Sequence, residues 1–191
     1  MADSDLARRS KKALAEGRTL VFIDESGFRL LPLLVRTWAP RGKTPILRVP
    51  LSWKHLSAIA AITPQGKLFT RIQQRGFKAP DIVRFLQHLL RFLPGKLLII
   101  WDNLSAHASK KVKDLVGQHH DRLLITHLPP YAPELNPVEL LWSHLKQGEL
   151  KNLVCSDLPQ LLSELRKAIW RVRHRKDTLK RFIQHIGLYH V

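Results

Sequence analysis

Residues 96–103 read Lys96-Leu97-Leu98-Ile99-Ile100-Trp101-Asp102-Asn103, an unbroken apolar run that ends in an acidic residue. A short run of this kind is typical of a strand that is buried on both faces of a sheet. Open α/β sheets bind their ligands at the carboxyl ends of such strands. We therefore predict a central strand at 96–102, with Asp102 at the edge where function is expected.

The rest of the chain alternates strand and helix patterns around this run. A second apolar run, Leu20-Val21-Phe22-Ile23-Asp24, predicts a buried strand at 19–25. The pattern also predicts a hairpin of strands, an irregular Pro- and Gly-containing loop, a fifth strand and four helices. Their expected ranges are 55–63 and 67–74 for the hairpin, 36–45 for the loop, 122–128 for the strand, and 80–93, 107–119, 136–148 and 157–176 for the helices.

This order of elements predicts an α/β fold, a mixed five-stranded sheet flanked by helices in the ribonuclease H-like layout. The first and fourth strands are neighbours in that layout, so Asp24 and Asp102 would meet. We expect three parts: a basic linker or short helix at 1–18, the ribonuclease H-like domain at 19–150, and a basic helical extension of the same domain at 151–191.

The charge of the chain indicates a polyanionic partner. Its 191 residues include 32 Lys and Arg against 15 Asp and Glu, a net charge of +17. Such an excess is typical of proteins that bind nucleic acid, although a basic protein can also bind anionic lipid or simply be well solvated. The single Cys155 excludes an internal disulfide. No long apolar segment or secretory signal is present, so we expect a cytoplasmic protein that is associated with the nucleoid when bound to DNA.

Three acidic residues are candidates for metal-dependent phosphodiester chemistry, namely Asp24, Asp102 and Glu139. Two divalent ions that cut or join phosphodiesters need carboxylates from several elements. Each acid also has a structural interpretation. Asp24 would bond to a Ser26-Gly27 turn. Asp102 would lie in a turn or cap the following helix, and Glu139 would form a capping box with Asn136.

Other polar residues have weaker patterns. Strand alternation points Glu25 away from Asp24, and Asn103 would orient Asp102 or contact substrate. His107 is expected at a helix start or beside the site rather than in catalysis. No zinc spacing, phosphate-binding loop or serine or cysteine nucleophile motif is present. For the basic residues Arg171, Arg173 and Arg175, DNA contact and plain solvation both remain open.

With these residues the chain resembles the catalytic domain of mariner-superfamily transposases, and most closely the bacterial insertion sequence 630 family. The resemblance spans about residues 19–150. It rests on an ordered set of motifs: Ile23-Asp24-Glu25-Ser26-Gly27-Phe28, residues 36–43, Trp101-Asp102-Asn103-Leu104-Ser105-Ala106-His107, and residues 128–142 together with Lys146.

The resemblance implies a DDE transposase that cleaves and transfers DNA strands in cut-and-paste transposition. Asp24, Asp102 and Glu139 would be its catalytic triad and would hold two Mg²⁺ or Mn²⁺ ions. A homodimer on DNA and a TA-type target are implied as well. The candidate nucleic-acid contacts are Arg36, Arg41, Lys43, Asn103, Lys146, Arg171, Arg173 and Arg175.

One feature departs from the family pattern. Family members carry an N-terminal helix-turn-helix region, whereas only about 18 residues precede the first expected strand here. We therefore expect either a helix-turn-helix region encoded upstream in a split gene or a truncated remnant. Two alternatives stay open: a catalytically idle or inhibitory DNA-binding fragment, and another ribonuclease H-like nuclease.

Overall fold

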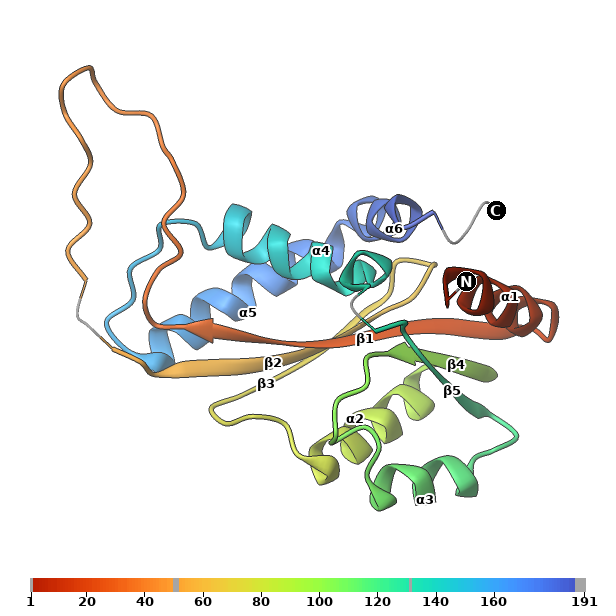
Figure 1. Ribbon diagram of the computed structural model, residues 1–191. Helices are drawn as coiled ribbons and strands as arrows, with labels where there is room; N and C mark the ends of the chain where they lie inside the picture. Colours follow the sequence, from red (N-terminus) through yellow and green to blue (C-terminus); the bar gives the residue numbers. More distant parts are fainter. Residues whose placement is uncertain (1, 50–51, 131, 188–191) are drawn as a thin grey trace.

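The computed structural model describes residues 2–49, 52–130 and 132–187. Five strands form one mixed sheet in the order β3-β2-β1-β4-β5 (Figure 1). The strands are β1 (Arg18–Arg29), β2 (His55–Ile62), β3 (Leu68–Gln73), β4 (Lys96–Trp101) and β5 (Leu123–His127). β1 and β2 pair antiparallel, as do β2 and β3, whereas β1–β4 and β4–β5 are parallel. The predicted mixed five-stranded sheet is confirmed.

The register between β1 and β4 brings two acids to the same edge. Phe22 pairs with Ile100 in this parallel ladder. Asp24 and Asp102 each follow two residues later, so both acids lie just past the point where the parallel pairing of β1 with β4 ends.

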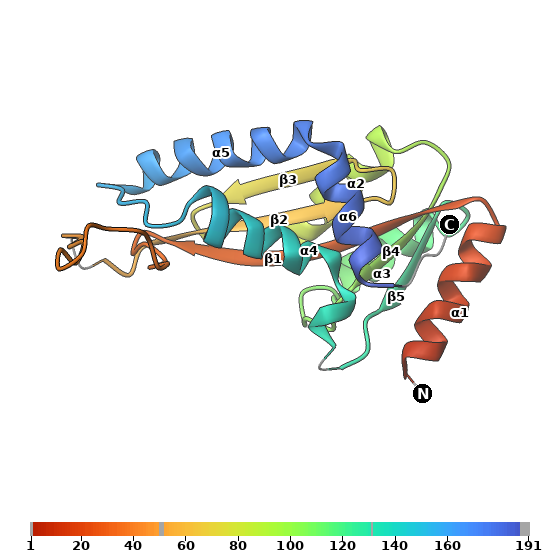
Figure 2. The same cartoon turned by 90° about the horizontal axis from the view of Figure 1, so that it is seen from above.

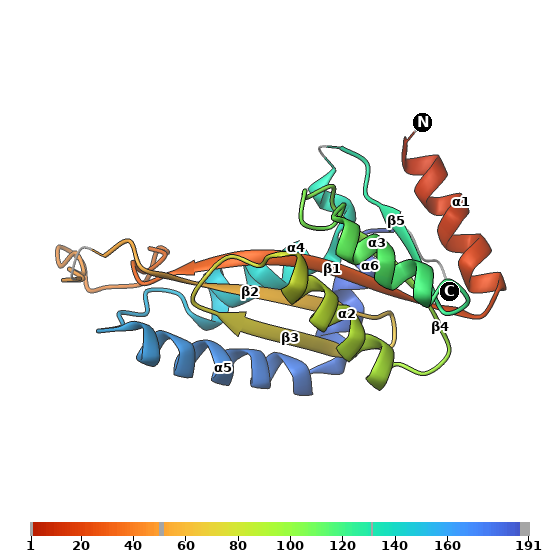
Figure 3. The ribbon, with the colours of Figure 1, turned by 90° about the horizontal axis from the view of Figure 1, so that it is seen from below.

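Helices cover both faces of the sheet. Figure 2 shows α4 (Pro137–Ser143), α5 (Leu158–His174) and α6 (Lys176–His185) on one face, and Figure 3 shows α2 (Ala79–Phe92) and α3 (Lys110–Gln118) on the other. The helix α1 (Ala2–Ala15) contacts β1 and β5, and a short 3₁₀ turn, η1 (Pro133–Leu135), precedes α4. Among the described residues, no helix is both long and apolar enough to span a bilayer.

Alternate residues of β1 contribute to two separate cores. Leu20 and Phe22 pack with α4, α5 and α6, whereas Val21 and Ile23 pack with α2 and α3. Both faces are buried, which explains the unbroken apolar run. The alternation also points Asp24 towards α4 and the neighbouring Glu25 towards the opposite face.

The first strand is longer than its sequence indicates. The Ser26-Gly27 pair predicted a turn after residue 25, but β1 continues to Arg29. Antiparallel pairing of Gly27 with Ser57 and of Phe28 with Leu56 satisfies this segment, so the prediction of a turn was wrong.

Three helices also differ from their predicted ranges. α3 begins at Lys110 rather than 107, because residues before it form a turn in which His107 N–H donates to Leu104 O. The helix predicted to reach 148 changes after Ser143 into a π-helical turn, η2 (His144–Glu149). The last predicted helix ends at His174, and α6 follows as a separate helix.

A long loop between β1 and β2 projects from the sheet (Figure 1). It includes the predicted irregular segment 36–45, which has no helix or strand. Asn152 ties its base to the body: the side-chain oxygen accepts from Val35 N–H at 2.8 Å, and its amide donates to Val35 O at 3.0 Å. We refer to residues 31–54 as the arm.

Candidate active site

The three predicted acids line one cavity of about 440 Å³. Asp24 comes from β1, Asp102 follows β4, and Glu139 lies in the first turn of α4. The remaining wall is formed by the segment after β5, including Pro129, Pro130 and Pro133. Residues far apart in the chain thus meet at the carboxyl end of the central strands.

Asn136 fixes the start of α4 beside Asp24. The Asn136 side chain is buried, accepts from Val138 N–H at 3.2 Å and donates to Ile23 O at 3.3 Å. One amide therefore caps the helix and anchors it to β1. Glu139 is the third residue of this helix.

The capping box proposed for Glu139 is not formed. The Asn136 N–H donates instead to Pro133 O at 2.9 Å. Within the part of the chain that the structure describes, the exposed Glu139 carboxylate accepts no hydrogen bond. Both of its oxygens therefore stay available for a cation in the cavity.

The Asp24 carboxyl accepts a hydrogen bond from Trp142, and its surroundings disfavour the ionised form. Trp142 Nε1–H donates to Asp24 Oδ2 at 2.8 Å. Burial, and next the charge of Glu139, raise the pKa of Asp24 to about 7, although the bond from Trp142 acts in the opposite direction. A cation bound between the acids would relieve this cost. The turn contact proposed for Asp24 is absent, because β1 continues past Gly27.

Asp102 is bound to its own loop and to a buried histidine. Its Oδ1 accepts from Leu104 N–H at 3.2 Å and lies 3.0 Å from His107 Nδ1. Burial alone would raise the pKa of Asp102, but the bonds from His107 and Leu104 outweigh it and the pKa lies below its usual value. Asp102 does not cap α3, whose N-cap is Ser109, but its bond from Leu104 N–H two residues later is the turn contact that was the other structural interpretation.

His107 joins the ends of β1 and β4. Its ring is only 3% exposed and stacks on Trp101, with ring centroids 4.1 Å apart and planes at 7°. Its Nε2 lies 3.2 Å from Glu25 Oε1, while its Nδ1 contacts Asp102. Burial would lower the pKa of His107, but these carboxylates raise it to about 9. A protonated ring can donate to both acids at once.

Sequence reasoning placed His107 beside the site but missed its bridge to Glu25. Strand alternation was a partial signal of this contact, because it predicts that the Glu25 side chain lies on the face of β1 opposite to Asp24.

Lys146 extends the contact between α4–η2 and β1. Its Nζ donates to Ser26 Oγ at 2.7 Å and lies 5.3 Å from the Phe28 ring centroid. Burial lowers the pKa of Lys146, although Glu139 and Asp24 oppose the shift. Sequence reasoning gave Lys146 only a nucleic-acid contact and gave Trp142 no role. The available signal was the spacing: Trp142 lies three residues after Glu139 and Lys146 four residues after Trp142, which puts all three on one helix face.

Residues 19–162 match the protein-family model described as DDE superfamily endonuclease. The chain belongs to this family.

Similar solved structures share the fold of this DDE endonuclease domain. The mariner Mos1 paired-end complex with Mg gives a TM-score of 0.70 at 16% identity, over 97% of this chain and 58% of that chain. The catalytic domain of Mos1 mariner transposase gives 0.60 at 16% identity, over 100% and 92%. The intasome of simian T-cell lymphotropic virus gives 0.55 at 18% identity, over 81% and 48%. These likenesses establish the ribonuclease H-like fold.

The DDE endonuclease domain spans about 61% of the Mos1 transposase chain in its paired-end complex with the left transposon end. No curated protein matches the sequence at a significant level.

The donor chemistry of the acidic cavity fits a divalent cation. Mg²⁺ and Mn²⁺ prefer carboxylate oxygens, and three carboxylates line this cavity. In the described ranges, however, no three His, Cys, Asp or Glu side chains are arranged to hold a metal ion as they stand. Trp142 and His107 engage one oxygen each of Asp24 and Asp102. Metal binding would therefore need side-chain rotation, and the ligand roles remain predictions.

The predicted nucleic-acid contacts lie in different environments. Arg36, Arg41 and Lys43 are exposed on the arm. Asn103 lines the acidic cavity and, among the described residues, makes no hydrogen bond to Asp102. The C-terminal arginines have protein partners: Arg171 and Arg175 contact Glu149 at 2.6 and 3.2 Å, and Arg173 donates to Thr70 Oγ1 at 3.1 Å. Arg171 and Arg175 thus contact η2, Arg173 contacts β3, and a DNA role for the three arginines stays a prediction.

Proposed function

We propose that this DDE superfamily endonuclease is the catalytic domain of a mariner-superfamily transposase of the insertion sequence 630 family. It would cleave and transfer DNA strands in cut-and-paste transposition. The observation that carries the proposal is the meeting of three carboxylates from three separate elements in one cavity. The Mos1 structures described with Mn and with Mg support the use of a divalent metal.

The residues of the cavity have distinct tasks in this proposal. Asp24, Asp102 and Glu139 would hold two Mg²⁺ or Mn²⁺ ions. When bound, these ions would activate water or a DNA 3′ hydroxyl as the nucleophile and stabilise the leaving oxygen. Trp142 holds one oxygen of Asp24, and His107 holds one oxygen of Asp102. The partly exposed site leaves room for a DNA strand to reach these acids.

The partners follow from charge and family. The net charge of +17 suits a DNA backbone. Neighbouring structures are described as Mos1 paired-end and strand transfer complexes. We include in the proposal a homodimer on DNA, a TA-type target and a helix-turn-helix region encoded upstream, all of which rest on the family resemblance.

A nicking assay tests the catalytic proposal. Supercoiled plasmid is incubated with the chain and Mg²⁺ or Mn²⁺, and nicked product is quantified. Asp102→Asn and Glu139→Gln should each lower the rate by at least about a hundredfold, because each removes a metal-binding charge. Asp121→Asn, at an exposed position outside the cavity, is the matched control. Wild-type rates in both acidic variants would rule the proposal out.

One observation favours a second candidate, a catalytically idle DNA-binding fragment. The described acids are not arranged to hold a metal ion without side-chain rotation. Such a fragment would bind DNA with the same affinity in Mg²⁺ and in a chelator, and would show no nicking in either. Metal-dependent nicking by the wild type excludes it.

A further inference from the structure

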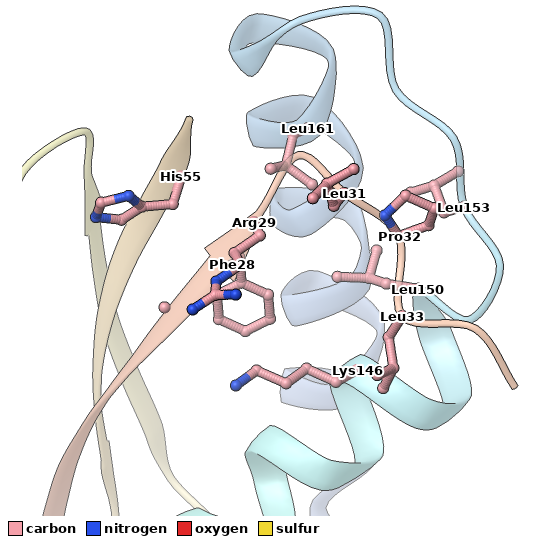
Figure 4. A pocket seen from close by; sticks show the side chains of 11 residues that line it. Phe28, Arg29, Leu31, Pro32, Leu33, His55, Lys146, Leu150, Leu153 and Leu161 are labelled. Carbon is pink, nitrogen blue, oxygen red and sulfur yellow. The ribbon is translucent and has the colours of Figure 1, made fainter. Parts of the chain in front are cut away.

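A second cavity, of about 700 Å³, lies between the end of β1, η2 and the start of α5 (Figure 4). One part of its wall is apolar and includes Phe28, Leu150 and Leu161. Another part is cationic, with Arg29 and Lys146. Its volume is within the range of about 300–1,000 Å³ that is usual for ligand pockets, and an apolar wall with few polar groups is the usual composition.

Lys146 connects this cavity to the acidic site. It lines the second cavity and donates to Ser26, two residues after Asp24. Asp24, Ser26 and Phe28 alternate onto the same face of β1, as their contacts with Trp142 and Lys146 show. At about 3.3 Å per residue, Phe28 lies roughly 13 Å along the strand from Asp24. This is about the length of four stacked nucleotides at roughly 3.4 Å each.

The charges of the second cavity favour an anion. In the described part of the chain, no acidic residue lines it, and the exposed Arg29 forms no ion pair. A nucleotide has a flat base that suits an apolar wall and a phosphate that suits Arg29 and Lys146. Enzymes that extrude a nucleotide from a duplex bind it in pockets of this mixed kind.

We propose that the second cavity binds one unpaired nucleotide of the DNA strand held at the acidic site. Its base packs against the leucine-lined wall, and its phosphate lies at the Arg29–Lys146 edge. The inference rests on the proposed function, because the acidic site must hold DNA for a nucleotide about four positions along the same strand to reach this cavity. The exposed Trp38 on the arm of a second copy is the competing occupant, but a neutral indole would not use the phosphate-binding capacity of Arg29.

A DNA-binding assay without cleavage tests this inference. The probe is a labelled duplex with a short single-stranded extension that contains a fluorescent adenine analogue, compared with the same duplex left blunt. Both are titrated by anisotropy, with Ca²⁺ in place of Mg²⁺. Because a base against an apolar or aromatic wall adds appreciable affinity, the wild type should prefer the extended probe by about tenfold. The fluorescence of the analogue should also change on binding.

Leu33→Trp fills the second cavity without removing core packing, because Leu33 lines it and is 47% exposed. This variant should lose the preference for the extension and keep wild-type affinity for the blunt duplex. Leu34→Trp is the matched control: the adjacent Leu34 is 71% exposed and does not line the cavity. It should bind both probes as the wild type does.

Arg29→Gln tests the cationic edge. It should weaken binding of the extended probe about fivefold and lower the salt slope by about one, as expected for one lost phosphate contact, and Arg29→Lys should restore most of the affinity. Arg71→Gln is the control, since Arg71 is exposed on β3 outside the cavity.

The inference is overturned by an equal wild-type affinity for the two probes, or by an unchanged preference in Leu33→Trp. It is also overturned if Leu33→Trp alters only DNA-free self-association in light scattering, which would assign the cavity to a second copy. The nicking assay is independent of these readouts. Preference for the extension without metal-dependent nicking would refute only the catalytic proposal, and nicking without the preference would refute only the nucleotide cavity.

Discussion

Asp24 combines a buried carboxylate with a neighbouring negative charge. Because its pKa is raised from 3.8 to about 7 in the folded chain, the folded state binds more protons than the unfolded state between these values. The metal-free protein therefore loses stability as the pH rises from about 4, and this contribution is fully lost above about 7. Asp24→Asn should raise the free energy of unfolding at pH 8 by about 1–2 kcal/mol, a value discounted for partial exposure.

Urea denaturation in a chelator, at pH 5 and pH 8, measures this effect. At pH 5 only about a third of the loss between pKa 3.8 and about 7 has developed, so the variant should gain clearly less stability than at pH 8. An equal effect at both pH values would contradict the assigned cause, because a packing change does not depend on protonation. The Asn side chain still offers an oxygen to Trp142 Nε1–H, so that contact is preserved.

His107 orients Asp102 through a ring nitrogen, and a phenylalanine at this position would remove that contact but keep an aromatic ring. His107→Phe keeps an aromatic ring on Trp101 and loses the bonds to Asp102 and Glu25. We expect Mn²⁺ affinity to fall about 10–100-fold, as it does when groups that support metal ligands are removed. His107→Gln, which keeps a donor, should recover part of the affinity. Calorimetric Mn²⁺ titration checks this, with the exposed His88→Phe as the control; equal affinities in all variants would leave His107 a purely structural role.

The start of α4 depends on Asn136, whose side chain both caps the helix and anchors it to β1. Asn136→Ala removes both the cap on Val138 and the bond to Ile23 O, and should cost about 1–2 kcal/mol in the free energy of unfolding. Asp157 caps α5 outside the acidic cavity, through a bond from Gln160 N–H at 2.8 Å. Asp157→Ala should therefore cost a similar amount of stability.

Comparison of the Asn136→Ala and Asp157→Ala variants separates the effect of a lost cap on stability from its effect on nicking. In the nicking assay, Asn136→Ala should lose more than tenfold in rate at a temperature where both variants are folded, because Glu139 is no longer fixed beside β1. Asp157→Ala should nick at nearly the wild-type rate. If the two variants lost activity equally, the anchor between Asn136 and Ile23 would have no specific part in the site.

The strands and most helices could be predicted because their patterns are local. The apolar runs before Asp24 and Asp102 identify buried strands, and two parallel neighbours must then share an edge. The extension of β1 to Arg29 could not be predicted, because pairing with β2 overrides a Ser26-Gly27 turn signal. No Gly or Pro marks the break between α5 and α6, and the apolar pattern continues across it.

In the site itself, the acids could be predicted but their partners only in part. The contact between Glu25 and His107 joins residues 82 positions apart, and no spacing rule reveals it. Likewise, Trp142 and Lys146 share a helix face with Glu139, but their targets on β1 depend on how α4 packs against the sheet.

At the scale of the whole molecule, the basic residues behind the net charge of +17 include both exposed cations and cations that form ion pairs. The arm residues Arg36, Arg41 and Lys43 are exposed, whereas Arg171 and Arg175 both contact Glu149. Counterion release makes each phosphate contact contribute about 0.9 to the slope of log affinity against log salt concentration. Replacing the three arm cations with Gln should therefore lower the DNA-binding slope by about two to three and leave the free energy of unfolding unchanged.

Replacing Arg171 and Arg175 with Gln gives the opposite expectation. These side chains are 38% and 55% exposed, so their loss should cost only about 0.5–1 kcal/mol of stability through Glu149, with little change in salt slope. Anisotropy titrations from low to physiological salt, together with urea denaturation, measure both quantities for both variants. The salt slope counts the phosphates that a surface neutralises. A reduced slope in the Arg171 and Arg175 variant, together with an unchanged slope in the arm variant, would show that DNA contacts α5 rather than the arm.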